Sequence, residues 1–484
     1  MNFRIVAYFM GWILEVEAVS MITPMIIAIA KGESDVWPWF LLLIVVLAPL
    51  GFFLTRKRFR KGNFYVREGY AATGLGWVLL SMTGALPFFL SGRMPSYIDA
   101  VFETASGFTT TGSSVLADIE ALGKGLLFWR SFTHWLGGMG VLVLILAILP
   151  MSGGYHMQLM KAESPGPSVS KLVPRVMDTA KTLYLIYIAL TVTMILLYWI
   201  SGMPLYDAAC IGFGTAGTGG FGVRNSGMAD YSRVSQILIT IFMYLFGVNF
   251  NFYYLLSRRK FKDALKMEEI RVYVSIILIN IVVVTLVNWH YNYRAEGFVY
   301  SLHHSAFTIG SLMSTTGFST VDFDKWPELT RLMMVLLMFT GACAGSTGGG
   351  LKVSRLMLLF KEARKEMHML IHPQSVRPIK QEGKVVEHSV LRSASNYLMI
   401  YVLIFVCAFL LVSIDGYDFT TNFTAVTATL NNIGPGLSMV GATQNYSIYS
   451  PLSKLVLTFC MLAGRLELLP MLMLFYPKTW TKHY

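Results

Sequence analysis

Residues 314–321 read STTGFSTV, a polar stretch around one glycine that separates two long apolar runs. Non-helical backbone lies at membrane depth only where protein buries it or where it lines water, because each unpaired carbonyl group in lipid costs several kcal/mol. A glycine there allows a positive φ or a close approach of two backbones. If the flanking runs cross a membrane, the stretch predicts a buried or water-lining strand within a helical bundle.

The rest of the chain has the composition of a polytopic membrane protein. Of its 484 residues, 55% are hydrophobic and 14% are charged, which is more apolar than a soluble domain. A membrane helix needs about 20 apolar residues, and about ten such runs are present. They cover residues 5–30, 37–54, 70–92, 127–150, 180–200, 235–256, 272–290, 329–345, 394–414 and 453–476. The first run lacks a cleavage site and is expected to remain as a helix.

The placement of charge predicts how the chain crosses the membrane. The net charge is +12, and basic clusters occur at 55–64, 161–181, 257–266, 352–392 and 478–482. Even numbers of predicted crossings separate these clusters, and the loops between them are acidic. By the positive-inside rule, the clusters and both termini face the cytoplasm. The positive charge is therefore expected to contact anionic lipid rather than nucleic acid.

The polar interruption occurs four times. Each copy follows a half-length apolar stretch in an acidic loop: YIDAVFETASGFTTTGSSV (97–115), LYDAACIGFGTAGTGGFGV (205–223), SLHHSAFTIGSLMSTTGFSTV (301–321) and YDFTTNFTAVTATLNNIGPGL (417–437). Their glycines align as Gly112, Gly220, Gly317 and Gly434. The half-length stretches are too short to cross a bilayer and predict re-entrant pore helices. Asp99, Asp207, Ser301 and Asp418 are the residues expected at their starts.

The repeat predicts an all-α membrane protein with two N-terminal helices and four span, pore helix, span units in pseudo-fourfold arrangement around one pore. The expected divisions are residues 1–68 for the N-terminal pair, then 69–155, 156–260, 261–365 and 366–484 for the four units. Four strands meeting around one axis can turn their carbonyl oxygens inward and replace the hydration shell of an ion. A potassium-sized cation suits such a ring.

The four strands, together with WRSFTHWLGGMGV (129–141), TGACAGSTGGGLKVSR (340–355) and NNIGPGLS (431–438), resemble the TrkH branch of the Trk/Ktr/HKT superfamily of potassium transporters. The resemblance covers nearly the whole chain. It implies potassium uptake without enzymatic activity, with K⁺ bound at backbone carbonyls and no cofactor. The corresponding filter residues are Thr110, Thr111, Gly112, Thr218, Gly219, Gly220, Thr315, Thr316, Gly317, Asn432, Ile433 and Gly434. Because their side chains are not fourfold symmetric, we expect Rb⁺ and some Na⁺ to pass.

A gate is expected in the third unit. The segment 341–352 is rich in glycine, which costs about 1 kcal/mol per residue in a helix interior, and the second span should break there. The resemblance implies that this loop and Arg465 obstruct the pore. The implied gating residues are Arg465, Gly345, Ser346, Thr347, Gly348, Gly349 and Gly350.

The resemblance also implies partners and a location. A homodimer in the bacterial cytoplasmic (inner) membrane is expected, gated by a cytoplasmic nucleotide-binding ring of the TrkA type. The basic segment 361–390 is the expected docking surface for that ring.

Several alternatives stay open at this level. Arg465 could instead form an ion pair with Glu467 or another carboxylate, or bind the carbonyls of residues 341–350. Glu103 could support the filter from behind or only accept hydrogen bonds from nearby amides. A Na⁺- or H⁺-coupled symporter is a second functional class, although the fourfold unit favours a central pore. An intramembrane enzyme would need a nucleophile with its base, an aspartate dyad or a metal set, and none is apparent.

Polar groups elsewhere are given structural roles. The cysteines show no paired spacing, so neither a disulfide framework nor a zinc site is indicated. His134, His303 and His304 lack further ligands at metal-binding spacing and are expected to be polar packing groups. GFGTAG at 212–217 follows a predicted pore helix rather than a strand, and is therefore not a dinucleotide fingerprint.

Overall fold

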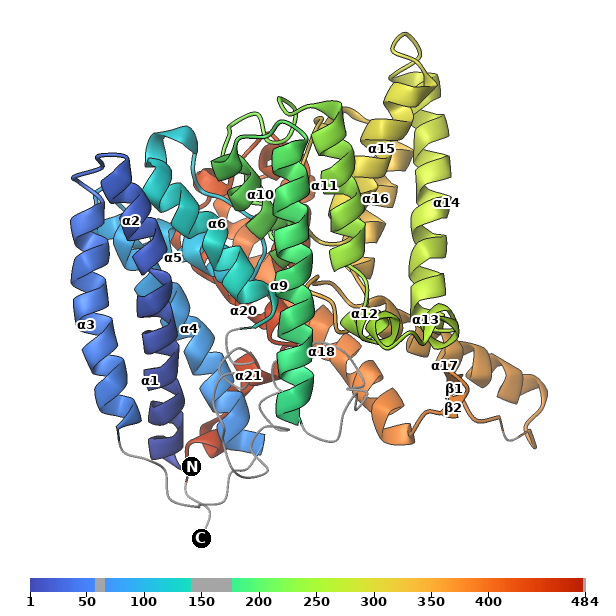
Figure 1. The fold of residues 1–484 in the computed structure, drawn as a ribbon. Helices are drawn as coiled ribbons and strands as arrows, with labels where there is room; N and C mark the ends of the chain where they lie inside the picture. Colours follow the sequence, from blue (N-terminus) through green and yellow to red (C-terminus); the bar gives the residue numbers. More distant parts are fainter. Residues whose placement is uncertain (57–65, 141–175, 376, 482–484) are drawn as a thin grey trace.

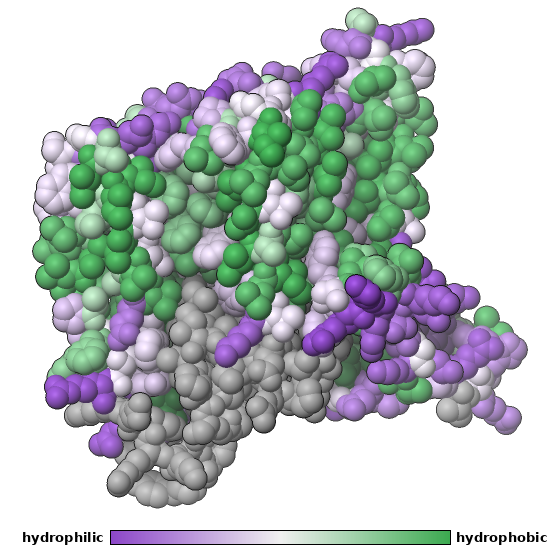
Figure 2. Space-filling model, viewed as in Figure 1, coloured by the Kyte–Doolittle hydropathy of each residue, from purple (hydrophilic) through white to green (hydrophobic). Residues whose placement is uncertain are grey.

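The computed structural model describes residues 1–56, 66–140, 176–375 and 377–481, which form a bundle of helices (Figure 1). Within these residues, six helices are long and apolar enough to cross a membrane, or seven if one bent pair is a single span. Figure 2 shows a hydrophobic band across the upright helices, with hydrophilic surface above and below it. The expected helical membrane fold is confirmed. Most of the basic clusters at 55–64 and 161–181 lies outside the described residues.

The N-terminal part contains three helices, because the first apolar run is divided at Met21. They are α1 (Phe3–Ser20), α2 (Ile22–Ala30) and α3 (Trp37–Thr55). Helices α1 and α3 approach closely at two glycines: a Cβ atom added to Gly51 would lie 2.7 Å from the Gly11 carbonyl oxygen. The Thr55 hydroxyl donates to Glu15 at 2.8 Å beside this contact. The approach therefore depends on the absence of two side chains.

Four units follow, each with a long first span and a short pore helix. The first spans are α4 (Val66–Leu90), α9 (Val176–Ile200), α14 (Glu268–Tyr291) and α18 (His388–Val412). The pore helices are α5 (Tyr97–Phe108), α10 (Leu205–Gly217), α15 (Phe298–Met313) and α19 (Phe419–Leu430). Asp99 and Asp207 lie in the first turns of α5 and α10, as expected, but the capping positions are Ser96 and Pro204. A cap at Ser301 is wrong, because α15 begins three residues earlier. Asp418 does cap α19, accepting the Thr421 N–H at 3.0 Å.

Within the described residues, the second spans of the second, third and fourth units each contain a break. The helices are α6 (Lys124–Gly138), α11 (Arg233–Phe246) with α12 (Phe250–Ser257), α16 (Glu328–Thr340) with α17 (Val353–Ile371), and α20 (Pro451–Arg465) with α21 (Leu469–Phe475). The break expected at 341–352 is confirmed, but continuous spans over 235–256 and 453–476 are wrong. Helix α12 turns by 91° from α11, and Glu467 and Leu468 take positive φ values between α20 and α21. Residues 141–150 of the run at 127–150 lie outside the described part.

The four units close into a ring. Helix α6 packs against α10 of the next unit, α11 against α15, α16 against α19, and α20 returns to α5. Each second span thus contacts the pore helix that follows it, and the fourth contacts the first. This cyclic packing confirms the expected pseudo-fourfold arrangement.

Short elements complete the fold. They are α13 (Phe261–Leu265), β1 (Lys380–Gln381), β2 (Lys384–Val385) and the 3₁₀ turns Glu120–Leu122, Phe323–Lys325, Ser413–Asp415, Ser438–Val440, Tyr446–Ile448 and Pro477–Thr479. Strands β1 and β2 pair in antiparallel fashion. The Met1 amine donates to the Thr481 carbonyl at 3.4 Å, so the two ends of the described chain lie together. We call this the terminus side and the opposite one the distal side.

The close approach of α1 and α3 predicts the effect of one methyl group. Gly51→Ala should destabilise the protein by about 1–3 kcal/mol, the usual cost of overpacking. Val46→Leu is the control, because Val46 lies on the exposed face of the same helix and is 50% exposed. Thermal unfolding in detergent measures both. Equal midpoints for the two variants would contradict a tight glycine contact.

Candidate functional site

Each pore helix ends in the same hydrogen-bonded turn. In the first unit, the Thr110 N–H donates to the Gly107 carbonyl at 3.0 Å and the Thr111 N–H to the Ser106 carbonyl at 2.8 Å. This pair of bonds is a Schellman motif, which requires a left-handed residue after the helix. Thr110, Thr218, Thr315 and Asn432 take that conformation, with φ of 55°, 55°, 59° and 55°.

Glycine normally takes the left-handed position after a helix, but all four of these residues carry a side chain. A left-handed conformation costs a residue with a side chain about 1–2 kcal/mol. The same turn recurs with N–H donors at Gly219, Thr316 and Ile433, at 2.7, 2.7 and 2.9 Å from their carbonyl acceptors. At the end of each pore helix, packing therefore offsets the preference of a residue with a side chain against the left-handed conformation. The four strands that follow begin in the same way.

The aligned glycines bring these strands together. Gly112, Gly220, Gly317 and Gly434 have φ of 85°, 78°, 86° and 98°. A Cβ atom added to one of the first three glycines would collide with a carbonyl oxygen of the next strand. Gly112 would meet the oxygen of Gly219, Gly220 that of Thr316, and Gly317 that of Ile433. A Cβ atom on Gly434 would lie 2.8 Å from the Thr111 oxygen. All twelve predicted filter residues thus lie in one closed ring of backbone.

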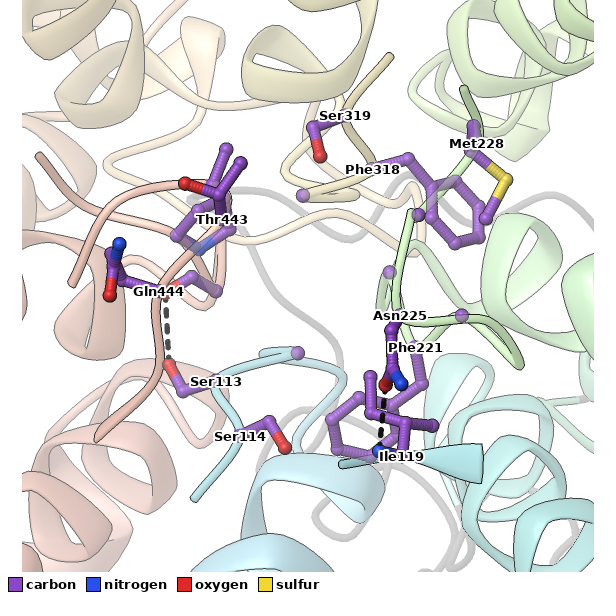
Figure 3. Close-up of a pocket in the computed structure, with 18 of the residues that line it drawn as sticks. Ser113, Ser114, Ile119, Phe221, Asn225, Met228, Phe318, Ser319, Thr443 and Gln444 are labelled. Atoms are coloured by element: carbon purple, nitrogen blue, oxygen red, sulfur yellow. Dashed lines mark hydrogen bonds between the residues drawn. The ribbon is translucent and has the colours of Figure 1, made fainter. Parts of the chain in front are cut away.

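A cavity of about 170 Å³ opens on the distal side of this ring. All four glycines line it, and Figure 3 shows chain from all four units around it. Figure 3 shows Ser113 and Gln444 on one side of the cavity and Phe221 and Phe318 on the other. Two cations, Arg130 and Arg224, also line it. The Ser113 hydroxyl donates to the Gly434 carbonyl at 3.1 Å, which joins the first strand to the fourth.

A buried ion pair supports the first two strands. Glu103 of α5 accepts the Arg130 Nε–H at 2.6 Å, and both side chains are almost fully buried. Glu103 also accepts the Val115 N–H at 3.0 Å, while Arg130 donates to the Gly222 carbonyl at 3.1 Å. The structure shows Glu103 accepting a nearby amide. Its place behind the first two strands is consistent with a supporting role, which stays a prediction. Sequence reasoning missed Arg130, although a charge within an apolar run is a recognised signal.

His134 links the same two units, as a polar packing group. Its Nδ1 lies 2.8 Å from the Gly107 carbonyl oxygen, and its Nε2 accepts the Phe221 N–H at 3.3 Å. His303 and His304 also have polar partners, Gln236 Oε1 at 2.6 Å and Thr320 Oγ1 at 2.9 Å.

The loop 341–352 lies directly against the terminus side of the ring. The Gly349 N–H donates to Thr315 Oγ1 at 2.6 Å, and a Cβ atom on Gly348 would lie 2.8 Å from the Ser314 carbonyl oxygen. The buried Lys352 ammonium donates to the Gly348 carbonyl at 2.5 Å. The predicted gating residues from Gly345 to Gly350 all belong to this loop, which therefore contacts the strands.

Arg465 binds carbonyl groups of that loop and of the first unit. Its guanidinium donates to the Thr347 carbonyl at 2.6 Å and to the Gly137 and Gly138 carbonyls at 2.7 and 2.6 Å. The last two belong to the C-terminus of α6, whose dipole favours a cation. Glu467 pairs with Arg355 instead. Of the alternatives for Arg465, the structure shows the bond to the loop carbonyls.

Glu269 of α14 is a second anchor of the loop that sequence reasoning missed. Its buried carboxylate accepts the Ala344 N–H at 2.6 Å and the Ser354 N–H at 3.2 Å. It also accepts the Asn249 side-chain amide at 3.3 Å, from the break between α11 and α12. The only hint in the sequence is a carboxylate at the edge of an apolar run, which helix starts commonly carry.

Comparison with known proteins points to one family. The family model TrkH, described as a cation transport protein, matches residues 40–482. The Trk system potassium uptake protein TrkH of Escherichia coli K12 is 36% identical over 99% of this chain and 100% of its own length. TrkG of the same strain is 32% identical over 99% of this chain and 98% of its own. The crystal structure of the potassium transporter TrkH from Vibrio parahaemolyticus superposes with a TM-score of 0.88 at 31% identity, over 99% of this chain and all of that one.

The buried ion pair behind the ring predicts an effect on stability. Glu103→Gln should destabilise the protein by about 3 kcal/mol or more, because it leaves the Arg130 charge buried without its partner. Asp35→Asn is the matched control. It breaks the Arg93–Asp35 pair, which is largely exposed, and should cost about 1 kcal/mol or less. Chemical denaturation of the two purified variants compares them, and equal losses would contradict the supporting role of Glu103.

Proposed function

Because this chain belongs to the TrkH family of cation transport proteins, we propose that its ring of four strands is the path through which it takes up potassium ions. The relatives are named as transporters, and the chain is a multi-pass membrane transporter rather than an enzyme. The observation that carries the proposal is the contact of each glycine with a carbonyl oxygen of the next strand.

Backbone carbonyls are the proposed ligands of the ion. A ring of carbonyl oxygens replaces the hydration shell of K⁺ without a side-chain charge. The proposed ligands are carbonyls of the filter residues Thr110–Gly112, Thr218–Gly220, Thr315–Gly317 and Asn432–Gly434. The Gly434 carbonyl also accepts the Ser113 and Tyr446 hydroxyls, at 3.1 and 2.8 Å. Since Gly219, Asn432 and Ile433 depart from the threonine pattern of the other strands, the ring should discriminate imperfectly. Rb⁺ and some Na⁺ are expected to pass.

The loop 341–352 and Arg465 are the proposed gate. Arg465 and Lys352 are two buried cations held by carbonyl oxygens on the terminus side of the ring, where they repel a permeating cation. Movement of the loop away from the strands would withdraw the Thr347 carbonyl that Arg465 binds. In this arrangement, with both contacts present, the path is closed.

The remaining assignments follow from charge and from the repeated unit. The terminus side carries the described basic clusters and is assigned to the cytoplasm of a bacterium. The division into residues 1–68, 69–155, 156–260, 261–365 and 366–484 is proposed as the domain organisation. A homodimer and a cytoplasmic nucleotide-binding ring of the TrkA type, docked at 361–390, are the proposed partners.

Substitution of one ring glycine tests the path. In proteoliposomes with an imposed voltage and no Na⁺ or H⁺ gradient, the parent protein should pass K⁺. Gly317→Ser should lower the K⁺ to Na⁺ flux ratio about tenfold, or about 1.4 kcal/mol, because its Cβ atom displaces the Ile433 carbonyl. Gly297→Ser is the control: Gly297 also has a positive φ, of 93°, but faces open space. An unchanged ratio in Gly317→Ser would contradict the proposed path. A requirement for a Na⁺ or H⁺ gradient would favour the symporter.

Removal of Arg465 tests the gate. Arg465→Ala should raise K⁺ flux without the cytoplasmic ring about tenfold, because it removes both a cation and the bond that holds Thr347. Arg465→Lys keeps the charge and should stay closer to the parent. Arg331→Ala controls for loss of an arginine, since Arg331 pairs with Asp324 and Glu328 away from the loop. Parent-like flux in Arg465→Ala would rule this gate out.

A further inference from the structure

The chain between the second and third units forms a basic surface at the terminus side. Helix α12 turns away from α11 by 91°, and with α13 it lies across the lower ends of the upright helices (Figure 1). We call residues 250–266, which contain both helices, the interfacial segment. Its direction suits a helix that lies along a membrane surface rather than one that crosses the membrane.

The interfacial segment combines cations with exposed apolar side chains. Five basic residues and one acid, Asp263, lie within nine positions, and all six are exposed. The five are Arg258, Arg259, Lys260, Lys262 and Lys266. Phe261 and Leu265, four residues apart and thus on one helix face, are 56% and 69% exposed. Cations beside apolar groups match the phosphates and the acyl boundary of an anionic leaflet.

The same segment is continuous with the surface that faces lipid. Helix α14, which follows it directly, exposes Val274 and Leu278 along its length. Figure 2 shows hydrophilic surface immediately below the hydrophobic band in this part of the molecule. A protein docked only by charge would leave Phe261 and Leu265 in water, whereas a bilayer edge covers them. The apolar pair therefore favours lipid as the occupant.

Backbone hydrogen bonds tie this segment to the loop 341–352. The Phe250 N–H, at the start of α12, donates to the Gly345 carbonyl at 3.0 Å. The Cys343 N–H donates to the Gly247 carbonyl at 3.0 Å, and the Thr347 hydroxyl to the Phe246 carbonyl at 3.3 Å. The break between α11 and α12 and the loop beneath the ring are thus parts of one hydrogen-bonded structure.

The other end of the segment is tied to the same loop. Glu269, three residues after Lys266, accepts the N–H groups of Ala344 and Ser354 and the side-chain amide of Asn249. Both ends of the interfacial segment therefore hold the loop. A displacement of the segment relative to the membrane would be transmitted to the loop through bonds at both ends.

We propose that the interfacial segment binds the headgroups of anionic phospholipids, and that this binding holds the loop 341–352 in place against the strands. The second half of this proposal rests on the proposed function of the loop as a gate. An anionic leaflet then favours the closed path, and loss of anionic lipid releases the segment and opens it. The ion path becomes sensitive to the composition of the membrane around it.

The test uses the purified full-length protein without the cytoplasmic ring, in vesicles of phosphatidylcholine alone or with phosphatidylglycerol. Retained phosphatidylglycerol is counted by native mass spectrometry, and K⁺ flux is measured in each lipid. The test variant carries Arg258→Gln, Lys260→Gln and Lys262→Gln. The matched control carries Lys31→Gln, Arg233→Gln and Arg294→Gln, which remove the same charge from exposed positions on the distal side.

We expect the parent and the control to retain phosphatidylglycerol and to pass K⁺ about fivefold or more slowly in anionic vesicles, the lower end of usual coupling between sites. The test variant should retain less of this lipid and pass K⁺ equally fast in both vesicles. Equal retention by the test variant and the parent would overturn the lipid site. If the K⁺ flux of the parent is the same in both kinds of vesicle, the proposed link between the lipid site and the loop is overturned.

Two further outcomes are distinguishable. In a second measurement the cytoplasmic ring is added to the same vesicles. If lipid has no effect on K⁺ flux but the test variant no longer responds to the added ring, the segment docks that ring and the lipid proposal is overturned. If neither the parent nor Arg465→Ala passes K⁺ in any vesicle, the proposed function itself fails, and the link to the gate fails with it. If Arg465→Ala passes K⁺ measurably, and the K⁺ flux of the parent is the same in both kinds of vesicle, only the inference about the interfacial segment is overturned.

Discussion

Unpaired backbone groups cannot remain in lipid, and this constraint explains why four copies of one polar strand occur in a single chain. Each strand begins with two N–H groups bonded back to its pore helix, as at Thr110 and Thr111. The rest of its backbone must be covered by the neighbouring strands, and the glycines make that contact close enough. The order of helix packing, in which each second span covers the next pore helix and α20 returns to α5, closes the ring that protects the strands.

The ring is nearly symmetric, but its supports are not. The position of Glu103, nine before its glycine, holds Ile211, Thr308 and Ala425 in the other units, so the ion pair with Arg130 stiffens only the side formed by the first two strands. The third unit supplies the loop, and the fourth supplies Arg465. Arg465 contacts the first and third units at once, which connects the proposed gate to two sides of the path. A single chain can specialise its four units in this way, whereas four identical subunits would carry every change four times.

The sequence predicted the features that depend on repetition. Four aligned glycines were enough to predict where the strands lie, because four close backbone contacts in one chain can form together only around a shared axis. The break after Arg465 was not predictable in the same way, because residues 466–468 read LEL, without glycine or proline. The break after Phe246 does begin at a glycine, Gly247, but a single glycine within an apolar run is a weak signal. The break after Arg465 is stabilised from outside, by the pairing of Glu467 with Arg355 of α17. Glu269 was missed for a related reason, since its partners Asn249, Ala344 and Ser354 are brought together only by the fold. The bond between Arg465 and the Thr347 carbonyl was one of several open alternatives, and the structure shows it.

The backbone carbonyls around the four glycines are proposed to form one cation site. Anomalous X-ray diffraction from crystals of the full-length protein grown in thallium, a heavy ion of nearly the size of potassium, tests this most directly. Anomalous density is expected on the axis among Gly112, Gly220, Gly317 and Gly434, with backbone carbonyls from all four strands as ligands. If density is absent from this ring, or lies at side-chain carboxylates elsewhere, the ring is not the cation site.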